Sequence, residues 1–192
     1  NCRALERGIL QKELQLSVEE STRPDAPVLL SAAYRNVTEV HFRVVAIESE
    51  EILSPRRNYR ELREFLADFL ARPRVAEWSQ PLPDAGDYKL HRADLRAPAL
   101  PTGSYMLLMS HDRNFALLDN AIAYTKLQVT HLSLQSFQDG NGDHLFWVTD
   151  AVEGQPLENV RVEMFTQHWR SRDNRYELTR TGNATTDAGG KF

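Results

Sequence analysis

The chain has 192 residues, of which 41% are hydrophobic and 26% charged, so it can bury one large core or two small ones. Its 23 basic and 27 acidic residues are interspersed, with a net charge of -4, which argues against a basic nucleic-acid stripe and against an acidic tail. The single cysteine, Cys2, excludes an internal disulfide and a multi-cysteine metal site, and no apolar run approaches the roughly 20 residues of a membrane helix.

Residues 1–13 are polar and helical in character, and we interpret them as the end of a preceding element. The chain starts with Asn1 and not with Met, and no signal segment follows. Such a start is typical of a processed chain or an excised piece.

From residue 14 the apolar period changes to two, as half-buried strands require. Early alternating segments cover 14–18, 28–34 and 40–46, and the turn-rich stretches ESTRPDAP and YRNVTE separate them. Later strand signals are VAEWSQ, DYKLHRADLRA, GSYMLLMSH and NAIAYTKLQV. We therefore predict about seven strands within 14–129, arranged as an antiparallel β-sandwich.

One amphipathic helix interrupts these strands, and we predict it at about 57–72. Its apolar residues recur at helical spacing and form a single stripe, while charged residues cover the other face. Pro73 ends the pattern. The stripe consists of Leu62, Phe65, Leu66, Phe69 and Leu70. We expect this inserted helix to lie on a sheet.

A second cycle of strands occupies 130–192. It reads HLSLQSF, HLFWVTD, NVRVEMF and RYELTRTG, and the final Lys-Phe starts a fifth strand. The predicted fold class is therefore all-β, with tandem antiparallel immunoglobulin-like β-sandwiches of which the second is incomplete. We expect the second unit to be less ordered than the first or to pair with a neighbouring chain, because a truncated sandwich exposes strand edges.

The DGNGDH turn is the main candidate for a metal site. Asp139, Asn141 and Asp143 have the one-three-five spacing of a calcium loop, with Asp150 at position twelve. Position six is His144 in place of the glycine that such loops need, and strand-like sequence follows. An Asn-Gly hairpin turn is therefore favoured, and calcium binding is the weaker alternative.

Other catalytic and cofactor signals are missing. The six histidines show neither metalloprotease spacing nor an acidic or cysteine partner at ligand spacing, and solvated strand positions are favoured for them: His41, His91, His111, His131, His144 and His168. Ser104 lacks the nucleophile elbow, Cys2 lacks the local signature of a catalytic cysteine, and AGGK lacks the first glycine of a Walker motif. We expect no catalytic residue and no cofactor.

The aromatic residues alternate within strands, which favours packing in the core or at its rim. The alternative is a stacking platform for a sugar or a nucleic acid. The residues concerned are Trp78, Trp147, Trp169, Tyr88 and Tyr105.

Several strand and turn motifs follow one another along the chain. WVTDAVEGQPLENVRVEMF followed by TGNATTDAGGKF gives a strand, Thr-Asp, a Gly-x-Pro-Leu turn, a Val-x-Val strand and Thr-Asp-x-x-Gly. PVLLSAAYRNVTEVHFRVVAI places a YRN turn before a second strand, and WSQPLPDAGDYKLHRADLRAPALPTGSYMLLMSHD adds Pro-Asp-x-Gly-Asp-Tyr and Leu-Pro-x-Gly-x-Tyr turns. From Leu14 onward the chain resembles the macroglobulin-type domains of the bacterial alpha-2-macroglobulin family, in the form found in Bacteroidetes-like bacteria.

This resemblance implies a non-catalytic structural and interaction segment of a large envelope protein built from stacked sandwiches. In thioester-bearing members a protease cuts a bait region, the protein collapses around it, and a Cys-x-Glu-Gln thioester bonds to the attacker. Cys2 is followed by Arg-Ala-Leu, so the thioester does not carry over to this segment. The implied partners are neighbouring macroglobulin domains and proteases, with no nucleic acid and no membrane insertion, and the implied location is the periplasm or the outer cell envelope.

The sequence leaves the contact surface and two rival functions open. The expected contact surface is the helix at 57–72 together with the linker near Thr130. One rival is an adhesin or carbohydrate-binding tandem β-sandwich that uses Trp78, Trp147 or Trp169. The other is an accessory module of a secreted hydrolase.

Overall fold

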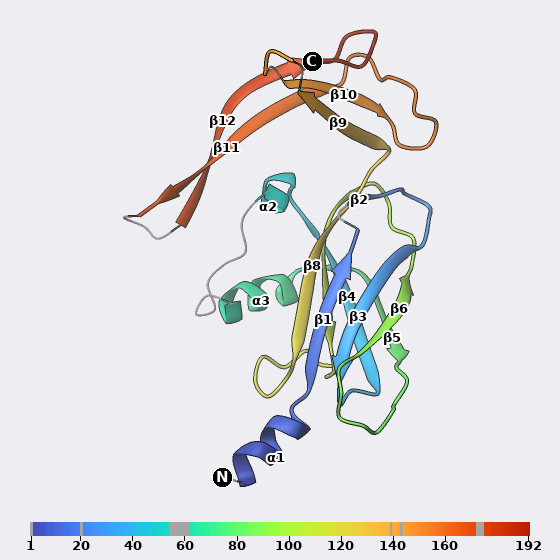
Figure 1. Ribbon diagram of the computed structural model, residues 1–192, viewed down its shortest axis with the longest axis vertical. Helices are drawn as coiled ribbons and strands as arrows, with labels where there is room; N and C mark the ends of the chain where they lie inside the picture. The colour runs from blue at the N-terminus through green and yellow to red at the C-terminus, as the bar shows by residue number, and fades with distance from the viewer. Residues whose placement is uncertain (1, 20, 54–61, 139, 143, 172–174) are drawn as a thin grey trace. The chain divides into compact units, whose positions relative to one another are not determined.

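The structure is a computed structural model that describes residues 2–19, 21–53, 62–138, 140–142, 144–171 and 175–192 (Figure 1). Contacts between residues divide the chain into two compact units, Asn1–Val129 and Thr130–Phe192. Within the described ranges, every helix is too short or too polar to cross a bilayer.

The first unit holds eight strands and three short helices among its described residues. The strands are β1 (Glu13–Val18), β2 (Ser21–Thr22), β3 (Val28–Arg35), β4 (Glu39–Ile47), β5 (Arg74–Pro81), β6 (His91–Ala97), β7 (Gly103–Ser110) and β8 (Ile122–Val129). The helices are α1 (Cys2–Leu10), α2 (Ser49–Leu53) and α3 (Leu62–Ala71).

Two sheets form a β-sandwich, which confirms the predicted fold class. The smaller sheet has the order β1-β3-β6 and the larger the order β2-β8-β7-β4-β5. Pairing is antiparallel except between β2 and β8, where Ser21 and Thr22 run parallel to Gln128 and Val129. The prediction of purely antiparallel pairing is wrong at this point, because the turn-rich break after β1 carries two residues across to the edge of the other sheet.

The sandwich core lies between the two sheets. Every second residue of β4 points into it, and Val40, Phe42 and Val44 are at most 1% exposed. The Phe42 ring stacks on Trp78 of β5, with 4.7 Å between the ring centroids and 12° between their planes. Trp78 therefore serves as packing at the rim of the core.

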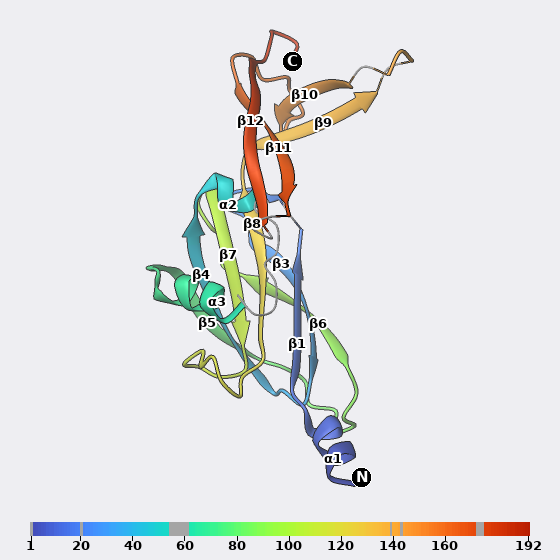
Figure 2. The ribbon, with the colours of Figure 1, turned by 90° about the vertical axis from the view of Figure 1, so that its left-hand side faces the viewer.

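A second core covers the opposite face of the five-stranded sheet. Leu66 and Phe69 of α3 pack there against Val45 of β4 and against Met106 and Leu108 of β7. In Figure 2, α3 lies beside β4 and β7 on the side away from β1, β3 and β6. The inserted helix thus lies on a sheet as expected, so that β4 and β7 are buried on both faces.

The helical region differs from its prediction in two respects. The helix predicted at 57–72 is observed as α3, which ends one residue early, and residues 57–61 lie outside the described residues. The short helix α2 was not predicted. Arg72 links the two helices, because its guanidinium donates hydrogen bonds to the Glu51 carboxylate at 2.9 and 3.0 Å and to Asp68 at 2.7 Å.

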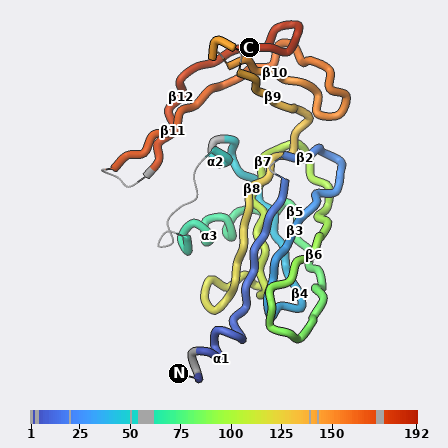
Figure 3. The backbone as a smooth tube through the Cα atoms, in the orientation of Figure 1, coloured from blue at the N-terminus to red at the C-terminus, as the bar shows by residue number. Residues whose placement is uncertain are grey.

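The second unit consists of two hairpins, which Figure 3 traces toward the C-terminus. They are formed by β9 (Leu132–Gln138) with β10 (His144–Asp150), and by β11 (Arg161–Arg170) with β12 (Arg175–Thr185). Within the described residues these two-stranded sheets do not close into a complete sandwich. Side-chain burial is correspondingly sparse, with Val148 at 4% exposure and Thr186 at 3%.

Two short segments of the second unit also pair with β10. Asp150 donates its N–H to the Gln155 carbonyl at 2.8 Å, and Val148 donates to the Gly190 carbonyl at 2.8 Å. The Phe192 N–H donates to the Phe146 carbonyl at 3.2 Å, and a β-bridge joins Trp147 to Lys191. The predicted start of a fifth strand is therefore observed as a bridge to β10.

Gly190 offers a test of this closure. Its φ is +73°, and a Cβ there would lie 2.5 Å from the Val148 carbonyl oxygen. Gly154 has a similar φ of +69° but open space around its Cβ position. Gly154→Ala should cost about 1–2 kcal/mol from backbone strain alone, whereas Gly190→Ala should cost more because of the added clash.

Amide hydrogen exchange at Val148 and Phe192 measures this difference. We expect both amides to lose protection in the Gly190→Ala variant and to keep most of it in the Gly154→Ala variant. Equal loss of protection in the two variants would show that the close approach of Gly190 to β10 is unimportant.

Candidate functional site

The DGNGD turn connects β9 to β10. Asp139 and Asp143 lie outside the described residues, and Asn141 lies in an exposed turn. Among the described residues no group of three or more His, Cys, Asp and Glu side chains could hold a metal ion. The calcium hypothesis therefore stays untested at its two carboxylates.

The three tryptophans belong to three different sheets. Trp147 lies edge-on to Phe137 at 6.3 Å between ring centroids, and Lys191 Nζ is 5.4 Å from the centre of its ring. Trp169 lies edge-on to Tyr176 at 4.8 Å, and these two side chains are 48% and 47% exposed. Among the described residues, Trp169 and Tyr176 are the one pair of aromatic side chains in contact that are both exposed.

The serine, cysteine and histidine candidates differ in burial and in hydrogen-bond partners. Ser104 is buried on β7, and Cys2 is exposed on α1. His91 lies 2.7 Å from Asp87, and His111 accepts a hydrogen bond from the Ala121 N–H at 3.1 Å. Burial is the main cause that lowers the pKa of His111.

The expected contact surface is only partly described. The apolar stripe of α3 faces the sheet, and Thr130 Oγ1 accepts a hydrogen bond from the Leu132 N–H at 3.0 Å. That the helix and the linker contact a partner stays a prediction.

A hollow of about 800 Å³ lies over β4 and β5, on the face of the sheet turned away from the sandwich core. It collects more charged side chains than any candidate that the sequence suggested. Its lining comprises Glu39, His41, Arg43, Arg74, Glu77, Trp78, Ser79, Arg113 and Asn114.

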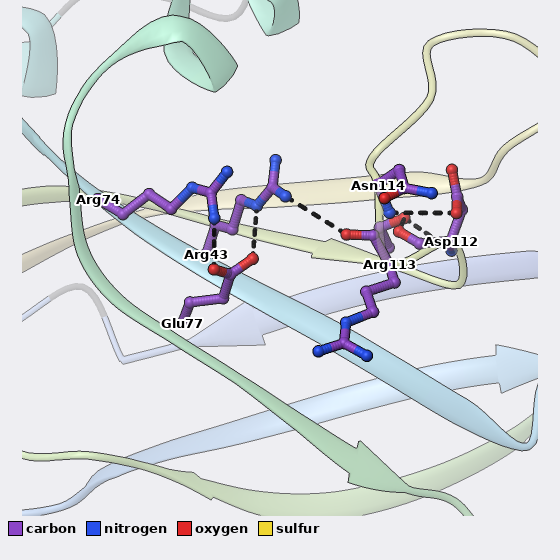
Figure 4. Close-up of polar contacts among 7 residues, drawn as sticks. Arg43, Arg74, Glu77, Asp112, Arg113 and Asn114 are labelled. Carbon is purple, nitrogen blue, oxygen red and sulfur yellow. Dashed lines mark hydrogen bonds and ion pairs between the residues drawn. The ribbon is translucent and has the colours of Figure 1, made fainter.

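Arg43 is the structural centre of this hollow. It is 8% exposed, and its Nε donates a hydrogen bond to Glu77 Oε1 at 2.9 Å. Its Nη2 donates to the Arg113 carbonyl at 3.3 Å (Figure 4). Its Cζ lies 4.2 Å from the centre of the Phe115 ring. Arg43 thus fastens the loop between β7 and β8 to the sheet, and its buried charge has partners on three sides.

Glu77 joins two arginines. Its second carboxylate oxygen accepts a hydrogen bond from Arg74 Nη1 at 2.5 Å. The hydrogen bond from Arg43, and then that from Arg74, lower the pKa of Glu77 below its ordinary value.

The loop after β7 is held in one conformation by its own side chains. The Asp112 carboxylate accepts hydrogen bonds from the N–H groups of Asn114 at 3.1 Å and Ala116 at 2.9 Å, and these bonds lower the pKa of Asp112. Ser110 is fully buried and donates to the Asp112 carbonyl at 2.7 Å, while Phe115 adopts a positive φ of 56° with its ring 2% exposed. This loop therefore presents the Arg113 and Asn114 side chains from a fixed backbone.

One arrangement in the hollow contains the residue types of a catalytic triad. His41 and Ser79 lie directly opposite each other on β4 and β5, and Glu39 Oε2 is 4.0 Å from His41 Nε2. All three residues are described, and no hydrogen bond joins Ser79 to His41. The nucleophile–base contact that acyl transfer requires is therefore not formed.

Arg43, Glu77 and Arg113 were not predicted from the sequence. A signal was present in EVHFRVVAI, because the residues of β4 on the Arg43 side change from charged to apolar at Val45. Such a change marks the point on the strand where the helix no longer covers this face of the sheet.

No family model matches the chain, and no curated protein matches it. Among solved structures, a CARDB domain from Pyrococcus furiosus in complex with di-metal ions matches 62% of this chain and 88% of its own length, at 10% identity and a TM-score of 0.34. A likeness at this level carries no argument about fold or function.

Replacing Glu77 tests the electrostatic role of the cluster. Glu77→Gln should lower the free energy of unfolding by about 1 kcal/mol at neutral pH, since the partly exposed carboxylate is screened by solvent. The folded-state pKa of Glu77 is depressed, so its contribution is complete above the ordinary value of 4.5 and is lost as the pH falls through the lowered value.

Denaturation of both proteins across an acid pH series measures this effect. The difference between wild type and variant should shrink as the pH falls below 4.5. Glu39→Gln is the control, since Glu39 is exposed and lies no closer than 4.0 Å to His41 in their ion pair. A difference that is independent of pH would contradict the assignment.

Proposed function

We propose that this chain is a non-catalytic structural and interaction segment of an alpha-2-macroglobulin-like protein, with a role in protease inhibition or entrapment at the bacterial envelope. Its partners are then neighbouring macroglobulin domains of the same protein and the proteases that this protein entraps. One observation carries the proposal. Residues of the motifs on which the family resemblance rests make turn hydrogen bonds in both units.

In the first unit these motifs bind to one another and to their own turns. Tyr34 of the YRN turn donates its hydroxyl to the Pro83 carbonyl at 2.9 Å, which joins it to the Pro-Asp-x-Gly-Asp-Tyr turn. Within that turn Asp84 accepts a hydrogen bond from the Gly86 N–H at 3.0 Å. In the Leu-Pro-x-Gly-x-Tyr turn, the Tyr105 hydroxyl donates to the Pro101 carbonyl at 2.9 Å.

Asn36 connects the YRN turn to the start of the chain. It adopts a positive φ of 55°, as an asparagine tolerates in a tight turn. Its Nδ2 donates hydrogen bonds to the Ile9 carbonyl at 2.7 Å and to the Gln11 carbonyl at 3.0 Å.

In the second unit the two quoted motifs meet in space. Thr186 Oγ1 donates to the Leu157 carbonyl at 2.6 Å and accepts from the Val160 N–H at 2.9 Å, which joins Thr-Asp-x-x-Gly to the Gly-x-Pro-Leu turn. Asp187 accepts hydrogen bonds from the N–H groups of Gly189 at 2.8 Å and Lys191 at 2.9 Å. The motif residues therefore have architectural tasks, which supports a role in holding modules in register and not in chemistry.

A protease-entrapment assay on the full-length protein that contains this segment tests the proposal. An entrapped protease is shielded from large substrates but still reached by small ones. We expect cleavage of casein to fall while cleavage of a fluorogenic tripeptide persists, and the 192-residue chain alone should leave both activities unchanged. Equal loss of both activities, or no loss of either, would contradict the proposed role.

One observation favours a second candidate, carbohydrate binding. The exposed Trp169–Tyr176 pair has the kind of aromatic surface on which sugars stack. Glycan-array binding that disappears in Trp169→Ala and persists in Trp78→Phe would support an adhesin. The absence of any glycan binding would leave the structural role alone.

A further inference from the structure

We infer that the hollow over β4 and β5, bounded by Arg43, Arg74 and Arg113, binds a carboxylate side chain of an acidic peptide in extended conformation. This inference goes beyond the proposed function and does not depend on it. It rests on the balance of donors and acceptors in the hollow, on the strand edge beside it and on the fixed position of its loop.

Hydrogen-bond donors predominate among the side chains of the hollow. Three arginines face two glutamates, and Glu77 is already bonded to both Arg43 and Arg74. Among the described residues, the side chains of Arg113, Asn114 and Ser79 have no hydrogen bond or ion pair. In Figure 4 no dashed line reaches the Arg113 guanidinium. A complementary ligand must therefore supply acceptor oxygens and negative charge.

A carboxylate fits this site better than a polyphosphate. The guanidinium fork of Arg113 matches the two oxygens of a carboxylate. The lining carries only one positive charge more than it carries negative charges, when His41 is neutral. A polyphosphate chain carries several negative charges and needs a longer row of cationic side chains.

The peptide is indicated by the strand edge next to the hollow. β5 is the last strand of the five-stranded sheet and pairs with β4 alone, so one side of its backbone is free of partners within the described part of the chain. An extended peptide can add there as a further strand, and main-chain hydrogen bonds then supply affinity.

Little ordering is needed for binding. Arg43 is fixed by Glu77, by the Arg113 carbonyl and by Phe115, and the loop that carries Arg113 is fixed by Asp112 and Ser110. A site whose backbone is already in place loses less entropy when a ligand binds.

The test uses the whole chain and a fluorescein-labelled hexapeptide of alternating threonine and glutamate, with glutamine in place of glutamate as the uncharged control. Fluorescence anisotropy should show saturable binding of the glutamate peptide that weakens with added salt. Arg113→Gln should weaken binding about tenfold, since a hydrogen bond to a charged group is lost. Arg113→Lys should recover part of the affinity, because it restores the charge without the fork.

Arg96→Gln is the matched control, since Arg96 is an exposed arginine on β6 of the other sheet, and it should bind like wild type. Arg113→Gln keeps the backbone carbonyl that Arg43 needs, so its thermal midpoint should equal that of wild type. The inference is overturned if the glutamate peptide does not bind, if the glutamine peptide binds equally well, or if Arg113→Gln binds like wild type. Stronger competition by a polyuronate than by the unlabelled peptide would overturn the choice of a peptide ligand.

Discussion

The first unit depends on burying both faces of the central strands of its larger sheet. β7 reads SYMLLMS without a break, and each of these residues is at most 9% exposed. Tyr105, Leu107 and Met109 face the sandwich core, while Met106 and Leu108 face α3. A strand in an ordinary two-sheet sandwich alternates apolar and polar residues, so a continuous apolar run requires a third layer. The inserted helix supplies that layer and is therefore part of the core.

The hollow lies where this third layer ends. On the outer face of β4 the residues pass from Ile47 and Val45 under the helix to Arg43 and His41 beyond it. Arg43 is 8% exposed, and its buried charge is tolerated because a carboxylate, a backbone carbonyl and an aromatic ring surround its guanidinium. The same side chain therefore ends the apolar face and fixes the loop that borders the hollow. Fold and candidate site are coupled through one residue.

Much of the fold could be predicted from the sequence because its signals are local. Alternation of apolar residues indicated the longer strands of both units, and the stripe at helical spacing indicated α3. The two-residue strand β2 and the short helix α2 carry no periodic signal, and they are defined by distant partners. Lys126 of β8, for example, donates hydrogen bonds to the Glu51 and Ile52 carbonyls at the end of α2, at 2.5 and 3.0 Å. The hollow was missed for the same reason, since Arg43, Glu77 and Arg113 come from three separate stretches of sequence.

The smaller sheet and α3 cover the two faces of the five-stranded sheet, and we expect both layers to contribute comparably to the free energy of unfolding. Urea unfolding of Leu108→Ala, set against Leu107→Ala, tests it most directly. Trp147→Phe and Trp169→Phe in the background leave Trp78 as the only tryptophan, so that its fluorescence follows the first unit. Both leucines are at most 1% exposed, and each substitution should cost about 2–5 kcal/mol. A near-neutral Leu108→Ala beside a costly Leu107→Ala would show that packing of the helix contributes little to stability, and it would contradict this account.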